Sequence, residues 1–187
     1  MEGFDFAFTL FGLVLGLAMA EVLAGFVRVL KARTAAPGVT KSIRIGWLTP
    51  ALSVVLICDL VSTWLLAWLS RDAISVTFVN LIGGTAAAAI YYIAASLVWP
   101  DDPSLWPDLD DWFDRHKAQI AGAILASNVA YSTIGLLIKS DEFPPLEQLL
   151  YGLFTIALIF TQRRWQSGLA IAGMLSLIAL YSVGVIF

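Results

Sequence analysis

Long apolar stretches alternate with short charged connections along the whole of this chain. The apolar stretches run over about residues 4–30, 45–69, 74–99, 118–138, 146–161 and 165–187. A helix rises about 1.5 Å per residue and needs about 20 residues to cross ~30 Å of hydrocarbon, so all but the fifth stretch are long enough. The fifth stretch begins just after Pro144 and Pro145, which are typical of a helix start. The pattern therefore predicts an all-α, polytopic transmembrane helical bundle of six spans, in a single domain over residues 1–187.

The composition supports the bilayer as the solvent of this chain. Of its 187 residues, 59% are hydrophobic and 13% are charged, and the mean hydropathy is +0.84, which is too apolar for a soluble domain of this size. The single cysteine, Cys58, and the single histidine, His116, exclude a thiolate cluster and a bis-histidine haem within one chain. The formal net charge of -3 argues against nucleic acid as a partner. We therefore expect the lipid bilayer as a partner, no cofactor and no metal site.

Basic residues are unevenly distributed between the connections. Nine of the 11 Lys and Arg residues lie in the first, third and fifth connections, whereas Arg71 and Lys139 lie in the other two. Cytoplasmic connections of membrane proteins are enriched in Lys and Arg, which predicts that the first, third and fifth connections face the cytoplasm. Both termini are then expected outside the cytoplasm.

Two acidic residues, Glu21 and Asp59, lie well inside the predicted spans, away from their ends. Inserting a centrally placed Asp costs roughly 2.5–3.5 kcal/mol, so each carboxyl needs a polar partner or a function. Asp59 shares a helical face with Ser62 and Thr63, which predicts a small polar patch. Three interpretations remain open: a neutral carboxyl bonded to a neighbouring helix, a pathway for protons or cations, and recognition of a partner subunit. We expect both side chains to point into the bundle and to have hydrogen-bond partners.

Two asparagines are further polar residues within the predicted spans. Asn128 lies seven residues from both Ala121 and Gly135, on a face of small side chains. This arrangement predicts close helix packing around an interhelical hydrogen bond, and such bonds contribute about 0.6 kcal/mol on average. The same role is predicted for Asn80, with a local irregularity of the helix at the glycine pair that follows it as an alternative.

Small side chains recur at every fourth position of the first predicted span, at Gly12, Gly16, Ala20 and Ala24. Such a ridge lets another helix backbone approach closely, so we expect tight packing on this face. Glu21 projects from a different face, roughly 140° away from Gly16. Because two of its faces should avoid lipid, the first span is predicted to be the central helix.

The third connection, residues 100–117, combines prolines, aromatic residues and aspartates. Its prolines prevent a continuous helix at the start, after which Asp108 is placed to cap a helix. The apolar spacing predicts a short helix at the membrane interface, with Trp106, Trp112 and Phe113 toward the membrane and the aspartates toward water. The acidic face is interpreted as solvated, with docking of a basic partner as the functional alternative. The candidates for docking are Trp106, Asp108, Asp110, Asp111, Trp112 and Asp114.

A family resemblance rests on segments in the first half and the middle of the chain. These are the first span with Gly12, Gly16 and Glu21, the basic connection that leads to Trp47, and the segments Trp99-Pro100-Asp101-Asp102 and Asp114-Arg115-His116-Lys117. In these segments the chain resembles an uncharacterised group of bacterial multi-pass inner-membrane proteins. The resemblance implies a location in a bacterial inner (cell) membrane and supplies no activity.

The short outer connections and the scarcity of catalytic residue types favour a protein that is not an enzyme. Our leading hypothesis is an accessory or scaffold subunit that packs against other membrane protein chains in a larger complex, with a homo-oligomer as a further option. The alternative is a small oligomeric transporter or channel for protons or cations that uses Glu21 and Asp59. Exposure separates the two hypotheses, because water-accessible carboxyls favour transport and dry, hydrogen-bonded carboxyls favour structure. An intramembrane enzyme is disfavoured, since no nucleophile–base pair is evident.

Overall fold

Six α-helices and one short 3₁₀-helix make up the described part of the chain. The computed structural model describes residues 2–34, 43–75, 77–138 and 145–186. The elements are α1 (Glu2–Thr34), α2 (Leu48–Leu69), α3 (Phe78–Val98), η1 (Pro103–Leu105), α4 (Leu109–Ile138), α5 (Pro145–Phe160) and α6 (Arg164–Ile186). The prediction of an all-α bundle is confirmed, and each α-helix overlaps one of the predicted apolar stretches.

Three of the described helices are long and apolar enough to cross a membrane. They are α2, α3 and the part of α1 that covers Phe4–Thr34. Helix α5 is apolar but has only 16 residues. Large apolar side chains such as Leu13, Val61 and Ile93 are exposed on the outside of the three long helices. A protein with this surface belongs in a bilayer, where lipid covers such side chains.

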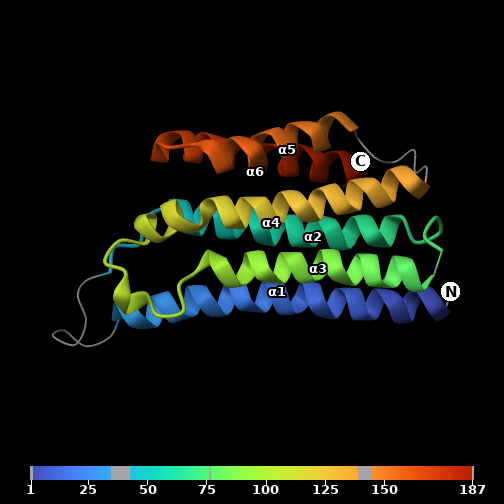
Figure 1. Cartoon of the computed structure of the whole chain (residues 1–187), viewed down its shortest axis with the longest axis horizontal. Coiled ribbons are helices and arrows are strands. Elements are labelled where there is room, and N and C mark those ends of the chain that lie inside the picture. The colour runs from blue at the N-terminus through green and yellow to red at the C-terminus, as the bar shows by residue number, and fades with distance from the viewer. Residues whose placement is uncertain (1, 35–42, 76, 139–144, 187) are drawn as a thin grey trace.

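The helices form an elongated bundle in which successive helices run in opposite directions (Figure 1). The start of α1 and the end of α6 lie at the same end of the bundle, on the right in Figure 1. The segment from the end of α3 through η1 to the start of α4 lies at the opposite end. The helix ends that border the connections rich in Lys and Arg therefore lie at one end of the bundle, opposite the two termini. The helix ends that border the other connections lie at the end of the termini.

Helix α2 is the most enclosed element of the bundle. It packs against α1, α3, α4 and α6, whereas α1 packs against α2, α3 and η1. The prediction that the first span is the central helix is therefore wrong. Helix α1 buries a single stripe of side chains, Phe11, Leu15, Ala18, Val22 and Val29. Because this stripe follows one helical face, the rest of α1 remains on the outside.

The small-residue ridge of α1 is not the packing face within this chain. Gly12 is close to a neighbour, since a Cβ atom there would lie 3.4 Å from the Trp64 indole nitrogen, but a Cβ at Gly16 would meet no atom within 4 Å. Ala20 and Ala24 are exposed. The closest approach on α1 is instead at Gly25, where a Cβ would lie 2.7 Å from Trp99. Within the described chain, close packing along the ridge occurs only at Gly12, because spacing alone does not say which small residues meet a neighbour. Packing of the ridge on another chain stays a prediction.

The third connection does not form a separate helix at the membrane interface. After η1, Asp108 caps α4 by accepting a hydrogen bond of 2.9 Å from the backbone amide of Asp110, and the helix then continues without a break to Ile138. Leu109 and Phe113 are buried in the core of the bundle. The predicted orientation is therefore wrong for Phe113, because the apolar spacing marks the start of the buried face of α4.

Candidate functional site

Asp59 lies near the middle of α2, with only 6% of its surface exposed. Its Oδ2 atom accepts a hydrogen bond of 2.7 Å from the Tyr91 hydroxyl of α3 and one of 3.3 Å from the Asn128 amide of α4. The expectation that Asp59 points into the bundle and has a partner is confirmed. Hydrocarbon offers a carboxyl no hydrogen bond, so these bonds favour the packing of α2, α3 and α4 against one another around Asp59.

The partners of Asp59 are themselves bonded to one another. The Tyr91 hydroxyl lies 3.3 Å from the Thr63 hydroxyl and 3.3 Å from the Asn128 amide nitrogen. Asn128 also donates a hydrogen bond of 2.9 Å to the carbonyl of Ile124. The prediction that Asn128 makes an interhelical hydrogen bond is confirmed. The result is a connected polar network across α2, α3 and α4, which fixes the position of the Asp59 carboxyl.

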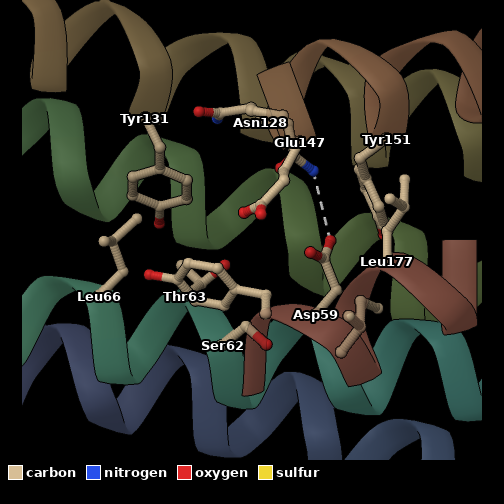
Figure 2. A pocket seen from close by; sticks show the side chains of 12 residues that line it. Asp59, Ser62, Thr63, Leu66, Asn128, Tyr131, Glu147, Tyr151 and Leu177 are labelled. Atoms are coloured by element: carbon tan, nitrogen blue, oxygen red, sulfur yellow. Dashed lines mark hydrogen bonds between the residues drawn. The ribbon is translucent and has the colours of Figure 1, made fainter. Parts of the chain in front are cut away.

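A cavity of about 110 Å³ lies beside this network, between α2, α4, α5 and α6. Figure 2 shows the carboxyls of Asp59 and Glu147 and the ring of Tyr131 directed toward the same space. The cavity is lined by Asp59, Ser62, Thr63, Leu66, Asn128, Tyr131, Glu147, Gln148, Tyr151, Leu177, Ile178 and Tyr181. This confirms the predicted polar patch of Asp59, Ser62 and Thr63. No basic residue is among the described residues that line the cavity, and the volume is large enough for several water molecules.

Two tyrosine hydroxyls at the cavity have no hydrogen-bond partner at ordinary distance among the described residues. Tyr131 of α4 and Tyr151 of α5 both line the cavity, and the hydroxyl oxygen of each is buried. The Tyr151 hydroxyl also lies close enough to the Asp59 carboxyl to interact with it. A buried hydroxyl without a partner costs roughly 1–3 kcal/mol. The ring of Tyr131 lies nearly parallel to that of Tyr91, with centroids 6.2 Å apart. The two hydroxyls are therefore available to a water molecule or a ligand in the cavity.

The residues from the start of α5 lie at the outer part of the cavity. Glu147 is exposed and Gln148 is half-buried, and the side-chain amide of Gln148 donates a hydrogen bond of 2.5 Å to the Ser132 hydroxyl of α4. The start of α5 lies at the same end of the bundle as the two chain termini (Figure 1). The cavity thus extends from the buried Asp59 toward the termini end, with Glu147 in contact with the surroundings.

Glu21 is not part of this site. Its carboxylate pairs with Arg28 of the same helix at 2.8 Å, and its side chain is 27% exposed. The expectation of a polar partner is confirmed, and the partner lies two turns along the same face of α1. Glu21 is not among the residues that line the Asp59 cavity. The structure therefore does not bring the two intramembrane acids together.

The remaining polar and small candidates have local roles. The Asn80 side-chain amide donates a hydrogen bond of 2.8 Å to the Ser75 carbonyl, and α3 continues without a break through the glycine pair. The interhelical role predicted for Asn80 is therefore wrong, because the residue lies in the first turn of α3 rather than at mid-span. Ala121 is buried, in agreement with close packing there, and the surroundings of Gly135 lie outside the described side chains.

Most of the acidic docking candidates already face a basic residue. Arg164, at the start of α6, binds Asp114 at 2.9 Å and Asp111 at 2.6 Å. It also lies within 4 Å of Asp108 and Asp110. These carboxylates raise the pKa of the Arg164 guanidinium, first through its hydrogen bond to Asp114. The acidic cluster is thus a clamp between α4 and α6.

One acid of this segment differs from the expected orientation, and its two tryptophans pack against each other. Asp110 is only 4% exposed, so the expectation that it faces water is wrong. Its burial, followed by repulsion from Asp108, raises the pKa of this carboxyl. Trp112 is half-buried and donates from its indole nitrogen to the Leu97 carbonyl at 3.1 Å, and its ring packs edge-on against Trp106 at 5.0 Å. The two rings thereby cover the end of α3.

The tyrosines and Glu147 are the site residues that the sequence reasoning missed. Four of the five tyrosines in the chain lie in this region, Tyr91, Tyr131, Tyr151 and Tyr181. A signal was present in Tyr91, because a tyrosine at the middle of a span lies far from the interface that such rings prefer. Nothing in the sequence indicates that the four come together, since this depends on which helices are neighbours.

Comparisons with protein-family models, curated proteins and solved structures found no match to this chain. The resemblance to bacterial inner-membrane proteins therefore stays a prediction. The functional argument rests on the geometry of the Asp59 site.

Proposed function

We propose that this protein binds a small cation in the Asp59 cavity and carries it across the membrane. The observation that carries the proposal is a carboxyl at mid-bundle that lines a cavity together with a second acid, Glu147, and no basic residue. A buried acid without a counter-ion is costly, and inside a membrane it typically marks an ion or substrate pathway. By the criterion of exposure alone, the buried and hydrogen-bonded Asp59 would favour a structural role. What favours transport is the cavity beside this carboxyl, which is large enough for water or a small ligand.

The closed side of the cavity favours a carrier over an open channel. From Asp59 toward the start of α2, the side chains Leu52, Val55 and Leu56 are buried in the core. The side chains of Phe113 and Ile120 from α4 are buried in the same core. A cation that reaches Asp59 from the termini end therefore meets dense apolar packing ahead of it. Release on the other side then needs a second conformation in which this packing opens.

The proposal includes six spans with both termini outside the cytoplasm of a bacterium, in the inner membrane. The support is the antiparallel order of the helices together with nine of 11 basic residues in alternate connections. Cysteine labelling in a Cys58→Ser background tests it. Lys31→Cys, Asp111→Cys and Gln162→Cys should be labelled only from inside, and Asp72→Cys and Glu147→Cys from outside. Labelling of the first three from the periplasm would overturn the orientation.

Charge movement in reconstituted vesicles tests the transport function. Full-length protein is placed in vesicles of phosphatidylethanolamine and phosphatidylglycerol, and currents are recorded on a solid-supported membrane after jumps in H⁺, Na⁺, K⁺ or alkylammonium ions. Wild type and Asp72→Asn should give currents, and Asp59→Asn should lose them while it stays monodisperse in detergent. The control fits because Asp72 is an exposed acid outside the cavity. Equal currents in the wild type and Asp59→Asn would overturn the proposal.

A non-enzymatic accessory or scaffold subunit is the second candidate. It is favoured by the exposed positions Gly16, Ala20 and Ala24 on α1, a ridge of small side chains that no helix of the described chain covers. Docking of a basic partner on the acidic residues is less favoured, because Arg164 already binds them. Purification from native membranes in mild detergent tests this candidate. A stable partner chain lost on Gly16→Ile but retained on Asp59→Asn would support it, and a protein that purifies alone or only with itself would count against it.

A further inference from the structure

The walls of the Asp59 cavity are mainly apolar and aromatic. Leu66, Leu177 and Ile178 supply aliphatic surface, and Tyr131 and Tyr151 supply ring faces. A bare metal ion needs several oxygen ligands at once. No group of three or more His, Cys, Asp or Glu side chains able to hold a metal exists among the described residues. The cavity therefore suits a cation that carries its own apolar surface.

The polar groups of the cavity match the donors of a primary ammonium group. An –NH₃⁺ group has three hydrogen-bond donors and no acceptor. The cavity offers the Asp59 carboxyl and the hydroxyl oxygens of Tyr131 and Tyr151, which accept no hydrogen bond from the described residues. All three can accept, and an ammonium near a tyrosine ring gains a further attraction to its face. A neutral ligand of the same shape would leave the carboxyl without a charge partner.

The volume limits the size of the ligand. An apolar cavity of about 150 Å³ accepts benzene, which has six non-hydrogen atoms. A cavity of about 110 Å³ is correspondingly suited to about four to five non-hydrogen atoms. This excludes most amino acids and polyamines and leaves short alkylamines.

We propose that the Asp59 cavity binds a small primary alkylammonium ion, with its charged end on Asp59, Tyr131 and Tyr151 and its alkyl part against Leu177 and Ile178. This inference rests on the proposed cation function and specifies its substrate class. Glu147, exposed at the outer part of the same cavity, adds a second negative charge that raises the local concentration of cations.

Calorimetric titration of the full-length protein in lipid nanodiscs tests the inference. The probes are tert-butylammonium and its neutral counterpart of the same shape, tert-butanol, with Na⁺ and K⁺ as inorganic cations. Saturable binding of tert-butylammonium is expected, with at least tenfold weaker affinity for tert-butanol. Asp59→Asn should weaken ammonium binding at least tenfold, and Asp72→Asn should leave it unchanged.

If Asp59→Asn does not fold, Tyr131→Phe provides a second test. It removes only a hydroxyl that has no hydrogen-bond partner among the described residues, so the variant should fold and bind tert-butylammonium several-fold more weakly. Equal affinity of the wild type for tert-butanol and tert-butylammonium would overturn the inference. Asp59-dependent currents with Na⁺ or K⁺, without binding of tert-butylammonium, would overturn the inference about the ammonium ion but would still support the proposed cation transport. No cation binding and no currents would overturn both.

Discussion

The hydroxyl group of Tyr91 donates a hydrogen bond of 2.7 Å to the carboxyl of Asp59 and joins α3 to α2 in the centre of the bundle. Both side chains are almost completely buried. The bond has two consequences. It satisfies a carboxyl at a depth where water is scarce, and it fixes the side of α2 on which the cavity opens.

Tyr91→Phe should destabilise the protein by about 1–3 kcal/mol, because it removes the shortest hydrogen bond to a buried carboxyl and leaves the longer one from Asn128. The matched control is Tyr92→Phe, on the next residue of α3, whose side chain is exposed. The apparent melting temperature in detergent should fall for the first variant and stay unchanged for the second. An equal effect of both variants would contradict the role of the Tyr91 bond.

The helices and part of the site could be predicted from the sequence. Apolar stretches between charged connections gave the six helices, because a bilayer leaves few other options for such a chain. The spacing of Asp59, Ser62 and Thr63 placed them on one face. Glu21 and Arg28 are seven residues apart, a spacing that puts two residues on one face of a helix, and the structure pairs them.

The neighbours of each helix could not be predicted in the same way. A ridge of small residues is equally compatible with packing inside the bundle, packing on another chain or contact with lipid, so α1 was wrongly expected at the centre. The meeting of Tyr91, Asn128 and Tyr151 around Asp59 depends on α3, α4 and α5 being placed around α2. Side-chain spacing within one helix carries no information about that arrangement.

Arg164→Gln should weaken the junction between α4 and α6. The guanidinium binds Asp111 and Asp114 directly, and its loss leaves a group of like charges next to one another. We expect a loss of about 1–2 kcal/mol at low salt, since the group is partly exposed, and a smaller loss at high salt, where these charges are screened. Arg163→Gln is the control, because the exposed Arg163 makes no ion pair among the described residues. A melting temperature that falls equally for both variants would contradict the clamp.

Asp110→Asn should change the pH dependence of stability. Burial and the nearby Asp108 raise the pKa of Asp110 in the folded protein above 3.8. The folded state then holds this proton more tightly than the unfolded chain, so protonation stabilises the protein as the pH falls through the folded pKa. The ionised carboxyl therefore reduces stability at pH 7, and Asp110→Asn should raise the melting temperature there, with a smaller difference at pH 4. Asp101→Asn, at an exposed acid of the same end, should have no effect. A lower melting temperature of Asp110→Asn at pH 7 would mean that the attraction to Arg164 outweighs burial.

Glu21→Gln should leave cation currents unchanged, in contrast to Asp59→Asn. Glu21 pairs with Arg28 on α1 and does not line the Asp59 cavity, so its charge has no direct part in binding at that site. Removing one partner of this pair leaves the other uncompensated, and some loss of stability is expected from the single variant. The double variant Glu21→Gln, Arg28→Gln removes both charges and serves as the control for that loss. Currents per folded protein should stay within about twofold of wild type for both variants, since a twofold change in affinity corresponds to only about 0.4 kcal/mol at the site. Loss of currents in the double variant, with the protein still monodisperse, would show that the pathway includes Glu21 and runs along α1 as well as through the cavity.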